Sequence, residues 1–134
     1  MKFVIDSSVA ICIYIDEPLS PAASKFMADG HDLFAPDSFH YEILGTLRKY
    51  ERAGYTTLTE DINRLLQLKI NITPTAFLLR SAALISRTHD ISPYDSLFLA
   101  LSTQLNIPLI TIDQRLVGAT LGKPFDVRHV RDVA

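Results

Sequence analysis

The stretch FVIDSS, residues 3–8, decides how the chain folds. Its apolar residues 3–5 end abruptly at Asp6, two serines follow, and an apolar helical pattern begins at Val9. This order predicts a buried strand, a tight turn and the start of a helix. A carboxylate at the carboxyl end of a buried strand lies where open α/β sheets bind their ligands. The alternative is that Asp6, with Ser7 or Ser8, only caps the helix.

Strand and helix patterns alternate along the rest of the chain. The expected strands cover residues 32–36, 69–73, 108–112 and about 125–130. The expected helices cover residues 9–15, 21–29, 38–53, 59–68, 75–88, 92–105 and 114–119. Such alternation predicts an α/β fold in which helices cover both faces of a parallel sheet. Because the chain has 134 residues and no repeat or flexible linker, we expect one domain spanning residues 1–134.

Composition and charge restrict the class of protein. Hydrophobic residues make up 48% of the chain, which suits a well-filled core, and no apolar run is long enough to span a bilayer. The single cysteine, Cys12, excludes an internal disulfide, and without a signal-type N-terminus we expect a cytoplasmic protein. The net charge of −2 argues against a generally basic nucleic-acid-binding surface, but it allows a local basic strip beside an acidic pocket.

Four acidic residues stand at special places in this pattern: Asp6, Glu42, Asp95 and Asp113. Asp6 and Asp113 each end a short apolar strand, and the carboxyl ends of parallel strands meet at one edge of a sheet. Glu42 lies about one turn into the helix that follows the second strand, and Asp95 lies in the first turn of a later helix. Because those helix starts face the same edge, all four side chains can converge on one pocket.

Each of these acids also has an ordinary explanation. Glu42 fits a solvent-facing helix position, Asp95 fits a capping box with Ser92, and Asp113 fits the cap of the next helix. Four carboxylates at one edge would, however, repel one another and raise one another's pKa values. A divalent cation relieves that repulsion, and a ligand set of oxygens alone predicts Mg²⁺ or Mn²⁺ rather than zinc. None of the four histidines has the spacing of a metal ligand.

The ordered set of motifs resembles the PIN domain, and most closely the VapC-type toxins of toxin–antitoxin pairs. The motifs are FVIDSS, the early-helix Glu42, SPYDSLFLALS around Asp95 and LITIDQRL around Asp113, and together they span essentially the whole chain. The resemblance implies a three-layer α/β/α fold with a central parallel sheet. It also implies a Mg²⁺- or Mn²⁺-dependent endoribonuclease in which the four acids are both the catalytic and the metal-binding residues.

The same resemblance implies roles for two hydroxyl residues and for partners. Ser7 matches the hydroxyl residue that follows the first acid, and Thr111 matches the threonine two places before the last acid. Ser96 stands where alanine is more common in the family. The implied partners are an RNA substrate and a cognate antitoxin protein that inhibits the enzyme. The implied assembly is a homodimer, and no membrane association is implied.

Basic residues are needed beside an acidic pocket, because the pocket alone would repel RNA. Lys49 lies two turns after Glu42 on nearly the same helix face, and Arg115 directly follows the turn at Asp113. Both are therefore candidate contacts to the RNA backbone, although ordinary solvated surface charge explains them equally well.

Two other functional classes stay open at this point. A phosphoacceptor signalling module would also combine a small α/β domain with an acidic Mg²⁺ pocket, but it needs a lysine where the late strand ends in Asp113. The other class is a PIN-like fold kept only as a non-catalytic binding subunit. Metal-dependent RNA cleavage by the purified protein separates both from the nuclease.

Overall fold

Five parallel strands form the central sheet of the protein, which a computed structural model describes over residues 1–133. Their order across the sheet is β3-β2-β1-β4-β5, and every neighbouring pair is parallel. The strands are β1 (Lys2–Ile5), β2 (Asp32–Pro36), β3 (Ile70–Thr73), β4 (Leu109–Thr111) and β5 (Val127–His129). The predicted α/β fold with a parallel sheet is confirmed.

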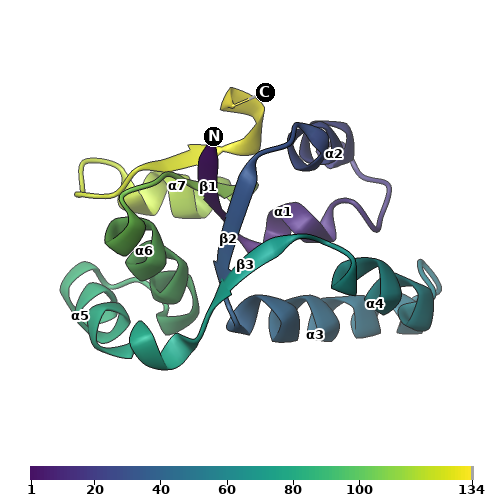
Figure 1. Cartoon of the computed structure of the whole chain (residues 1–134), viewed down its shortest axis with the longest axis horizontal. Helices are drawn as coiled ribbons and strands as arrows, with labels where there is room; N and C mark the ends of the chain where they lie inside the picture. Colours follow the sequence, from purple (N-terminus) through teal and green to yellow (C-terminus); the bar gives the residue numbers. More distant parts are fainter. Residues whose placement is uncertain (134) are drawn as a thin grey trace.

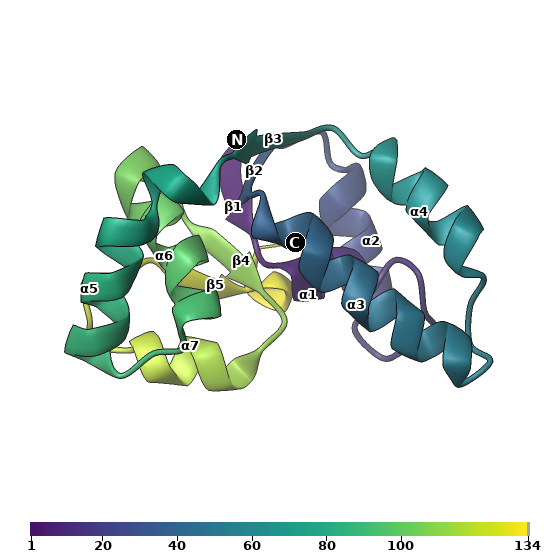
Figure 2. The same ribbon diagram turned by 90° about the horizontal axis from the view of Figure 1, so that it is seen from below.

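Helices cover both faces of this sheet, as Figures 1 and 2 show. On one face lie α1 (Ser7–Ile11), α2 (Ser20–Ala28), α3 (Ser38–Arg52) and α4 (Leu58–Leu66). On the other face lie α5 (Leu79–His89), α6 (Pro93–Leu105) and α7 (Gln114–Thr120). Two short 3₁₀ turns, η1 (Thr75–Phe77) and η2 (Val130–Asp132), complete the described chain. The three-layer arrangement predicted from the sequence is therefore present.

The core lies on both sides of β1, whose residues 3–5 are almost completely buried. From α3, the side chains of Phe39, Ile43 and Leu47 are fully buried, as their spacing of four residues predicts, while Tyr50 is half-buried. From the opposite face, α6 contributes a run of buried residues from Phe98 to Ser102. Because apolar side chains press on it from both sides, β1 is rigidly placed.

Two predicted helices differ from those observed. The first helix was expected over residues 9–15, but α1 begins at Ser7 and ends at Ile11, after which the chain turns back toward α2. The fifth was expected as one helix over residues 75–88, but it is divided into η1 and α5. The backbone N–H of Thr75, the first residue of η1, donates to Asp37 Oδ1 over 3.0 Å, which joins this segment to the residue that precedes α3.

The order in which the chain adds strands to the sheet changes direction between β1 and β4, although every neighbouring pair of strands is parallel. We call this place the strand reversal. The chain passes from β1 to β2 and β3, and then α5 and α6 carry it back to β4 on the other side of β1. In open α/β sheets the crevice at such a reversal, outside the carboxyl ends of the strands, is where ligands bind. Ile5 pairs with Ile110 in this register, so the residues that follow β1 and β4 emerge side by side.

Within residues 1–133, no helix is both long enough and apolar enough to cross a membrane.

Candidate active site

Asp6 lies at the carboxyl end of β1, and its side chain is held by hydroxyl groups. Ser8 Oγ and Thr111 Oγ1 each donate a hydrogen bond of 2.8 Å to Asp6 Oδ2. Asp6 precedes α1, but its carboxylate makes no capping hydrogen bond to that helix. The capping alternative for Asp6 is therefore wrong, and the side chain points across the strand reversal toward β4.

Burial raises the pKa of Asp6, because only 8% of the residue is exposed to solvent. The hydrogen bonds from Ser8 and Thr111 lower this pKa, while the negative charges of Asp95 and Asp113 raise it again. The net direction is upward, so the ionised form of Asp6 is under-compensated. The charges that act on Asp6 also show that the acids from α6 and from the end of β4 lie nearby.

Glu42 points into the same space from the second turn of α3. Its Oε2 accepts a hydrogen bond of 2.5 Å from Ser7 Oγ, while its Oε1 is buried and has no hydrogen-bond partner. Burial raises the pKa of Glu42, the Ser7 hydroxyl lowers it, and the charges of Asp6 and Asp95 raise it further. The solvent-facing alternative for Glu42 is therefore wrong, because one of its oxygens faces the interior without a donor.

Asp95 combines a position at a helix start with a position at the pocket. Its backbone N–H donates to Ser92 Oγ over 3.1 Å, so Ser92 caps α6 as the sequence predicts. The carboxylate itself makes no bond to the helix end and lies 3.4 Å from Arg115 Nη2. Its negative charge raises the pKa of both Asp6 and Glu42, so its carboxylate acts on the same pocket.

Asp113 serves the next helix as well as the pocket. Its Oδ1 accepts a hydrogen bond of 2.9 Å from the backbone N–H of Arg115 and so caps α7, as the ordinary explanation predicted. Its Oδ2 lies 3.0 Å from the guanidinium of Arg115. The same carboxylate raises the pKa of Asp6, so capping α7 does not remove Asp113 from the pocket.

Three hydroxyl side chains connect the acids to the sheet. Thr111 is completely buried; it donates to Asp6 and accepts a 3.0 Å hydrogen bond from the backbone N–H of Asp113. Ser7 joins Glu42 of α3 to the turn after β1. Ser8, which was not among the predicted site residues, donates to Asp6 and lies 3.4 Å from Thr111 Oγ1. The nearness of Ser8 to Asp6 in the sequence is the only signal that could have pointed to this hydrogen bond.

The two basic residues predicted to contact the RNA backbone, Arg115 and Lys49, lie at different distances from the acids. Arg115 bridges Asp95 and Asp113 at the rim of the pocket. Lys49 lies in the last turn of α3, seven residues after Glu42 or about 10 Å farther along the helix axis. Its side chain takes part in none of the ion pairs found within residues 1–133. The structure therefore brings Arg115 to the acids but not Lys49.

The residues present fit a divalent cation, although the side chains are not yet gathered around one point. Across residues 1–133, no three His, Cys, Asp or Glu side chains are already arranged to hold one ion. The donors that face the pocket are nevertheless carboxylate and hydroxyl oxygens, the ligands that Mg²⁺ and Mn²⁺ prefer. The buried Oε1 of Glu42 lacks a donor. A bound divalent cation would satisfy this oxygen and would stabilise the ionised forms of Asp6 and Glu42, whose pKa values are raised.

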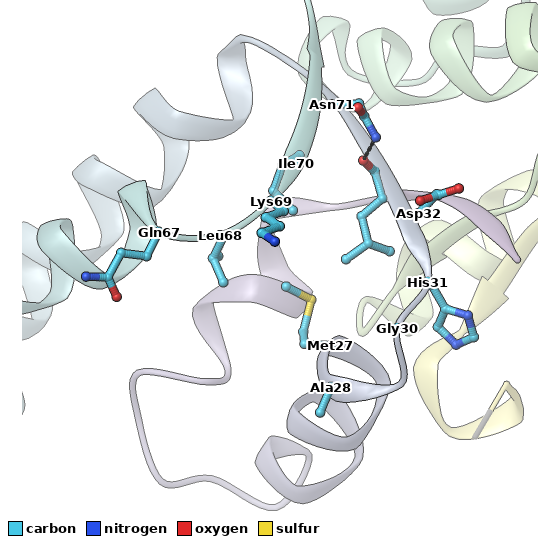
Figure 3. A pocket seen from close by; sticks show the side chains of 11 residues that line it. Met27, Ala28, Gly30, His31, Asp32, Gln67, Leu68, Lys69, Ile70 and Asn71 are labelled. Carbon is cyan, nitrogen blue, oxygen red and sulfur yellow. Dashed lines mark hydrogen bonds between the residues drawn. The ribbon is translucent and has the colours of Figure 1, made fainter.

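A sizeable cavity of the described chain lies elsewhere, at the amino edge of the sheet (Figure 3). It has a volume of about 730 Å³ and lies between the ends of α2 and α4 and the starts of β2 and β3. Asn71 lines it but uses its amide to donate to Leu33 O over 3.0 Å. None of the four pocket acids lines this cavity, so its size does not make it the candidate active site.

Comparison with known proteins identifies relatives of this architecture. The family model of the PIN domain matches residues 3–119. Ribonuclease VapC3 from Pyrobaculum aerophilum is 27% identical over 121 residues, which cover 87% of this chain and 92% of the relative.

Two solved structures share the fold. VapC20 from Mycobacterium tuberculosis, described as a toxin that cleaves the sarcin–ricin loop, superposes with a TM-score of 0.70 at 15% identity over 87% of this chain and 94% of its own. A chain of a toxin–antitoxin complex from Klebsiella pneumoniae superposes with a TM-score of 0.67 at 15% identity, over 95% of this chain and 96% of its own.

Proposed function

The chain belongs to the PIN-domain family, and from that membership we propose that it is a metal-dependent endoribonuclease, the toxin of a toxin–antitoxin pair. The observation that carries the proposal is the buried Asp6 beside the half-buried Glu42 at the strand reversal: burial raises the pKa of both, the charge of Asp95 raises both further, and the charge of Asp113 also raises that of Asp6. The similarity to a ribonuclease, which extends over most of the chain, supports the same activity.

Asp6, Glu42, Asp95 and Asp113 are proposed as the ligands of Mg²⁺ or Mn²⁺ and as the catalytic acids. When bound, such an ion activates water toward phosphorus and neutralises charge that develops on the phosphate. The chain's own contribution is orientation. Ser8 and Thr111 hold Asp6 Oδ2, and Ser7 holds Glu42 Oε2. These contacts leave Glu42 Oε1 without a donor and Asp6 Oδ1 with only a 3.5 Å contact from Ser7 Oγ, so both oxygens are available to the ion. Outer groups that hold the other oxygens in this way tune a metal site.

Charge at the rim determines how RNA approaches. The acids alone would repel the phosphate backbone, so we propose Arg115 as a backbone contact, with its guanidinium already beside the pocket. Lys49, about 10 Å along α3 from Glu42, stays a prediction as a second and more distant contact.

The alternative of a phosphoacceptor signalling module gains no support from the fold. Such a module needs a lysine at the end of its next-to-last strand, whereas β4 ends in Thr111 and is followed by Asp113. A non-catalytic binding subunit is not distinguished by architecture, so an activity measurement must decide.

Two kinds of protein partner are proposed. A solved relative of the same fold comes from a toxin–antitoxin complex, and we propose that a cognate antitoxin binds and inhibits this protein. We also propose a homodimer. Exposed apolar side chains of η1, α5 and α6, among them Phe77, Leu79 and Tyr94, offer surface that a second copy would bury. A cytoplasmic location and a single domain over residues 1–134 stay predictions.

The experiment is RNA cleavage by the purified protein with Mg²⁺ or Mn²⁺, with EDTA as the metal-free control. We expect cleavage only with the ion, and we expect Glu42→Gln to lose it, since Gln still accepts from Ser7 but lacks the charge. An unchanged circular dichroism spectrum shows that the variant is folded. Cleavage that persists in EDTA would contradict the metal-dependent mechanism. The absence of cleavage of any RNA would favour the alternative that the protein is a non-catalytic binding subunit.

A further inference from the structure

Arg115 is the one basic residue, among residues 1–133, whose side chain forms an ion pair with an acid of the pocket. Its Nη2 lies 3.0 Å from Asp113 Oδ2 and 3.4 Å from Asp95 Oδ2. The two carboxylates come from different elements, the turn after β4 and the start of α6. One cationic group of the chain thus already joins two of the four acids.

The side chain of Arg115 is held only through the contacts of its guanidinium group. The Arg115 side chain is 70% exposed, and those two carboxylates are the only side-chain partners it has in the described chain. Its backbone, by contrast, is fixed, because the Arg115 N–H donates to Asp113 Oδ1 over 2.9 Å. The side chain can therefore move away from Asp95 and Asp113 while the backbone of Arg115 stays beside the pocket.

The same two acids are needed by the proposed ion. A cation that bridges two carboxylates cancels the repulsion that a divalent ion would otherwise relieve. Two positive charges cannot share one pair of carboxylates without repelling each other.

We propose that Arg115 and the divalent ion compete for Asp95 and Asp113, so that Arg115 is an internal counter-ion which ion binding displaces. The inference rests on the proposed metal-dependent function. Once displaced, the guanidinium stays tethered at the Asp113 turn on the rim of the pocket. There it is free to bind a phosphate of the RNA, for which its planar fork of donors is well suited. Ion binding and RNA binding are thereby coupled.

The opposite role for Arg115 predicts the opposite sign. If Arg115 instead orients Asp95 and Asp113 for the ion, its removal scatters the two carboxylates and weakens ion binding. If it competes, its removal strengthens ion binding. Exposed ion pairs are weak, so we expect the dissociation constant for Mn²⁺ to fall by about two- to tenfold.

The test is calorimetric titration of Mn²⁺ into RNA-free wild type, Arg115→Gln and Arg128→Gln at neutral pH and low salt. Arg128 is the matched control, because it is also a partly exposed arginine paired with an aspartate, Asp126, at 2.9 Å. Asp126 directly precedes β5, at the amino edge of the sheet. We expect tighter binding in Arg115→Gln alone, and a difference that shrinks as monovalent salt screens the pair.

The possible outcomes distinguish a failure of the proposed competition from a failure of the proposed metal site. Binding that is unchanged or weaker in Arg115→Gln, with wild type binding normally, overturns the competition but leaves the metal site standing. Binding that tightens equally in Arg128→Gln reduces the effect to net charge and also overturns it. If neither wild type nor Arg115→Gln binds Mn²⁺, the proposed metal site itself fails.

A spectroscopic measurement observes the displacement directly. The side-chain Nε–H resonance of Arg115 should shift during a titration with diamagnetic Mg²⁺ and reach its end point together with the ion. The resonance of Arg128 should stay where it is. An Arg115 resonance that does not move as the ion saturates would show that the guanidinium never leaves the acids.

Discussion

Two aspartates are buried within residues 1–133, and their surroundings differ. Asp61, 4% exposed in α4, accepts a hydrogen bond from Thr56 and lies 3.6 Å from the guanidinium of Arg64. That guanidinium in turn lies 5.0 Å from the ring centre of Tyr14. Asp6, at the end of β1, receives only neutral hydroxyl donors and is surrounded by other acids.

The causes of the two pKa shifts follow this difference in part. Burial raises the pKa of both residues. For Asp61 the charge of Arg64 then lowers it and that of Glu60 raises it, whereas for Asp6 only hydroxyl hydrogen bonds lower it and the charges of Asp95 and Asp113 raise it. A buried acid that serves the fold has its cation supplied by the chain. Asp6 forms no ion pair within residues 1–133, and we expect a cation from outside the chain to stabilise it among its like charges. This contrast supports the proposal that the pocket is a binding site.

The largest expected effect separates the two aspartates by activity. Asp6→Asn should reduce RNA cleavage at least about 100-fold, since losing even groups that only support metal ligands costs 10–100-fold. Asp61→Asn should leave the cleavage rate unchanged, because Asp61 and Arg64 lie on α4, away from the pocket. The measurement is initial cleavage rate in saturating Mn²⁺. Equal losses in the two variants would erase the distinction between them.

A second test measures how each acid responds to the ion by thermal melting, in EDTA and in millimolar Mn²⁺. Wild type should gain about 2.7 kcal/mol of stability when Mn²⁺ is at 100 times its dissociation constant. Asp95→Asn should lose most of that gain and, in EDTA, be as stable as wild type or more so, because like-charge repulsion is relieved. Asp61→Asn should keep the full gain.

The contrary result for Asp95 has a clear form. If Asp95 acted only at the start of α6, its loss would cost about 0.3–1 kcal/mol with or without the ion. A variant that melts lower in EDTA yet keeps the whole Mn²⁺ shift would therefore remove Asp95 from the site.

The smallest expected effect is a pH dependence of stability. Because the folded-state pKa values of Asp6 and Glu42 are raised, the folded protein binds more protons than the unfolded chain above the ordinary carboxyl pKa. The contribution of Asp6 and Glu42 to metal-free stability should therefore be fully present below about pH 4 and be lost as pH rises through the raised pKa values. Mn²⁺ should reverse this loss at neutral pH, since the ion replaces the protons.

The control for the pH experiment is again Asp61. Melting curves of wild type, Asp6→Asn and Asp61→Asn in EDTA, from pH 4 to pH 8, show which acid causes the slope. We expect Asp6→Asn to flatten the curve more than Asp61→Asn, and only the pocket's share of the slope to disappear with Mn²⁺. A wild-type stability that rises over this range would contradict the burial of under-compensated acids.

Much of the fold was predictable because local patterns and tertiary packing agree. The buried run before Asp6, the exact bounds of β2 and the left-handed end of α6 at Asn106 follow from branching, proline and capping signals. The end of α1 and the division before α5 were not predictable. The segment before α5 begins at Thr75, whose hydrogen bond to Asp37 joins residues far apart in sequence.

The site was predictable in outline for a similar reason. Strand ends and helix starts at one edge of a parallel sheet bring the acids together whatever the details of packing. Which ordinary explanation applied was not predictable: Asp113 does cap α7, whereas Asp6 caps nothing. The ion pairs of Arg115 and the hydrogen bond from Ser8 depend on side-chain directions that only the folded chain defines.

The hydrogen bond between Thr111 and Asp6 joins residues 105 positions apart. During synthesis on a ribosome, Asp6 and Glu42 emerge early, whereas Asp95, Thr111 and Asp113 emerge only after most of the chain has been made. β4 cannot take its place beside β1 until then, so long-range closure comes late in folding. A growing chain therefore carries no complete set of acids, and translation of a ribonuclease toxin would be nearly finished before its active site could exist.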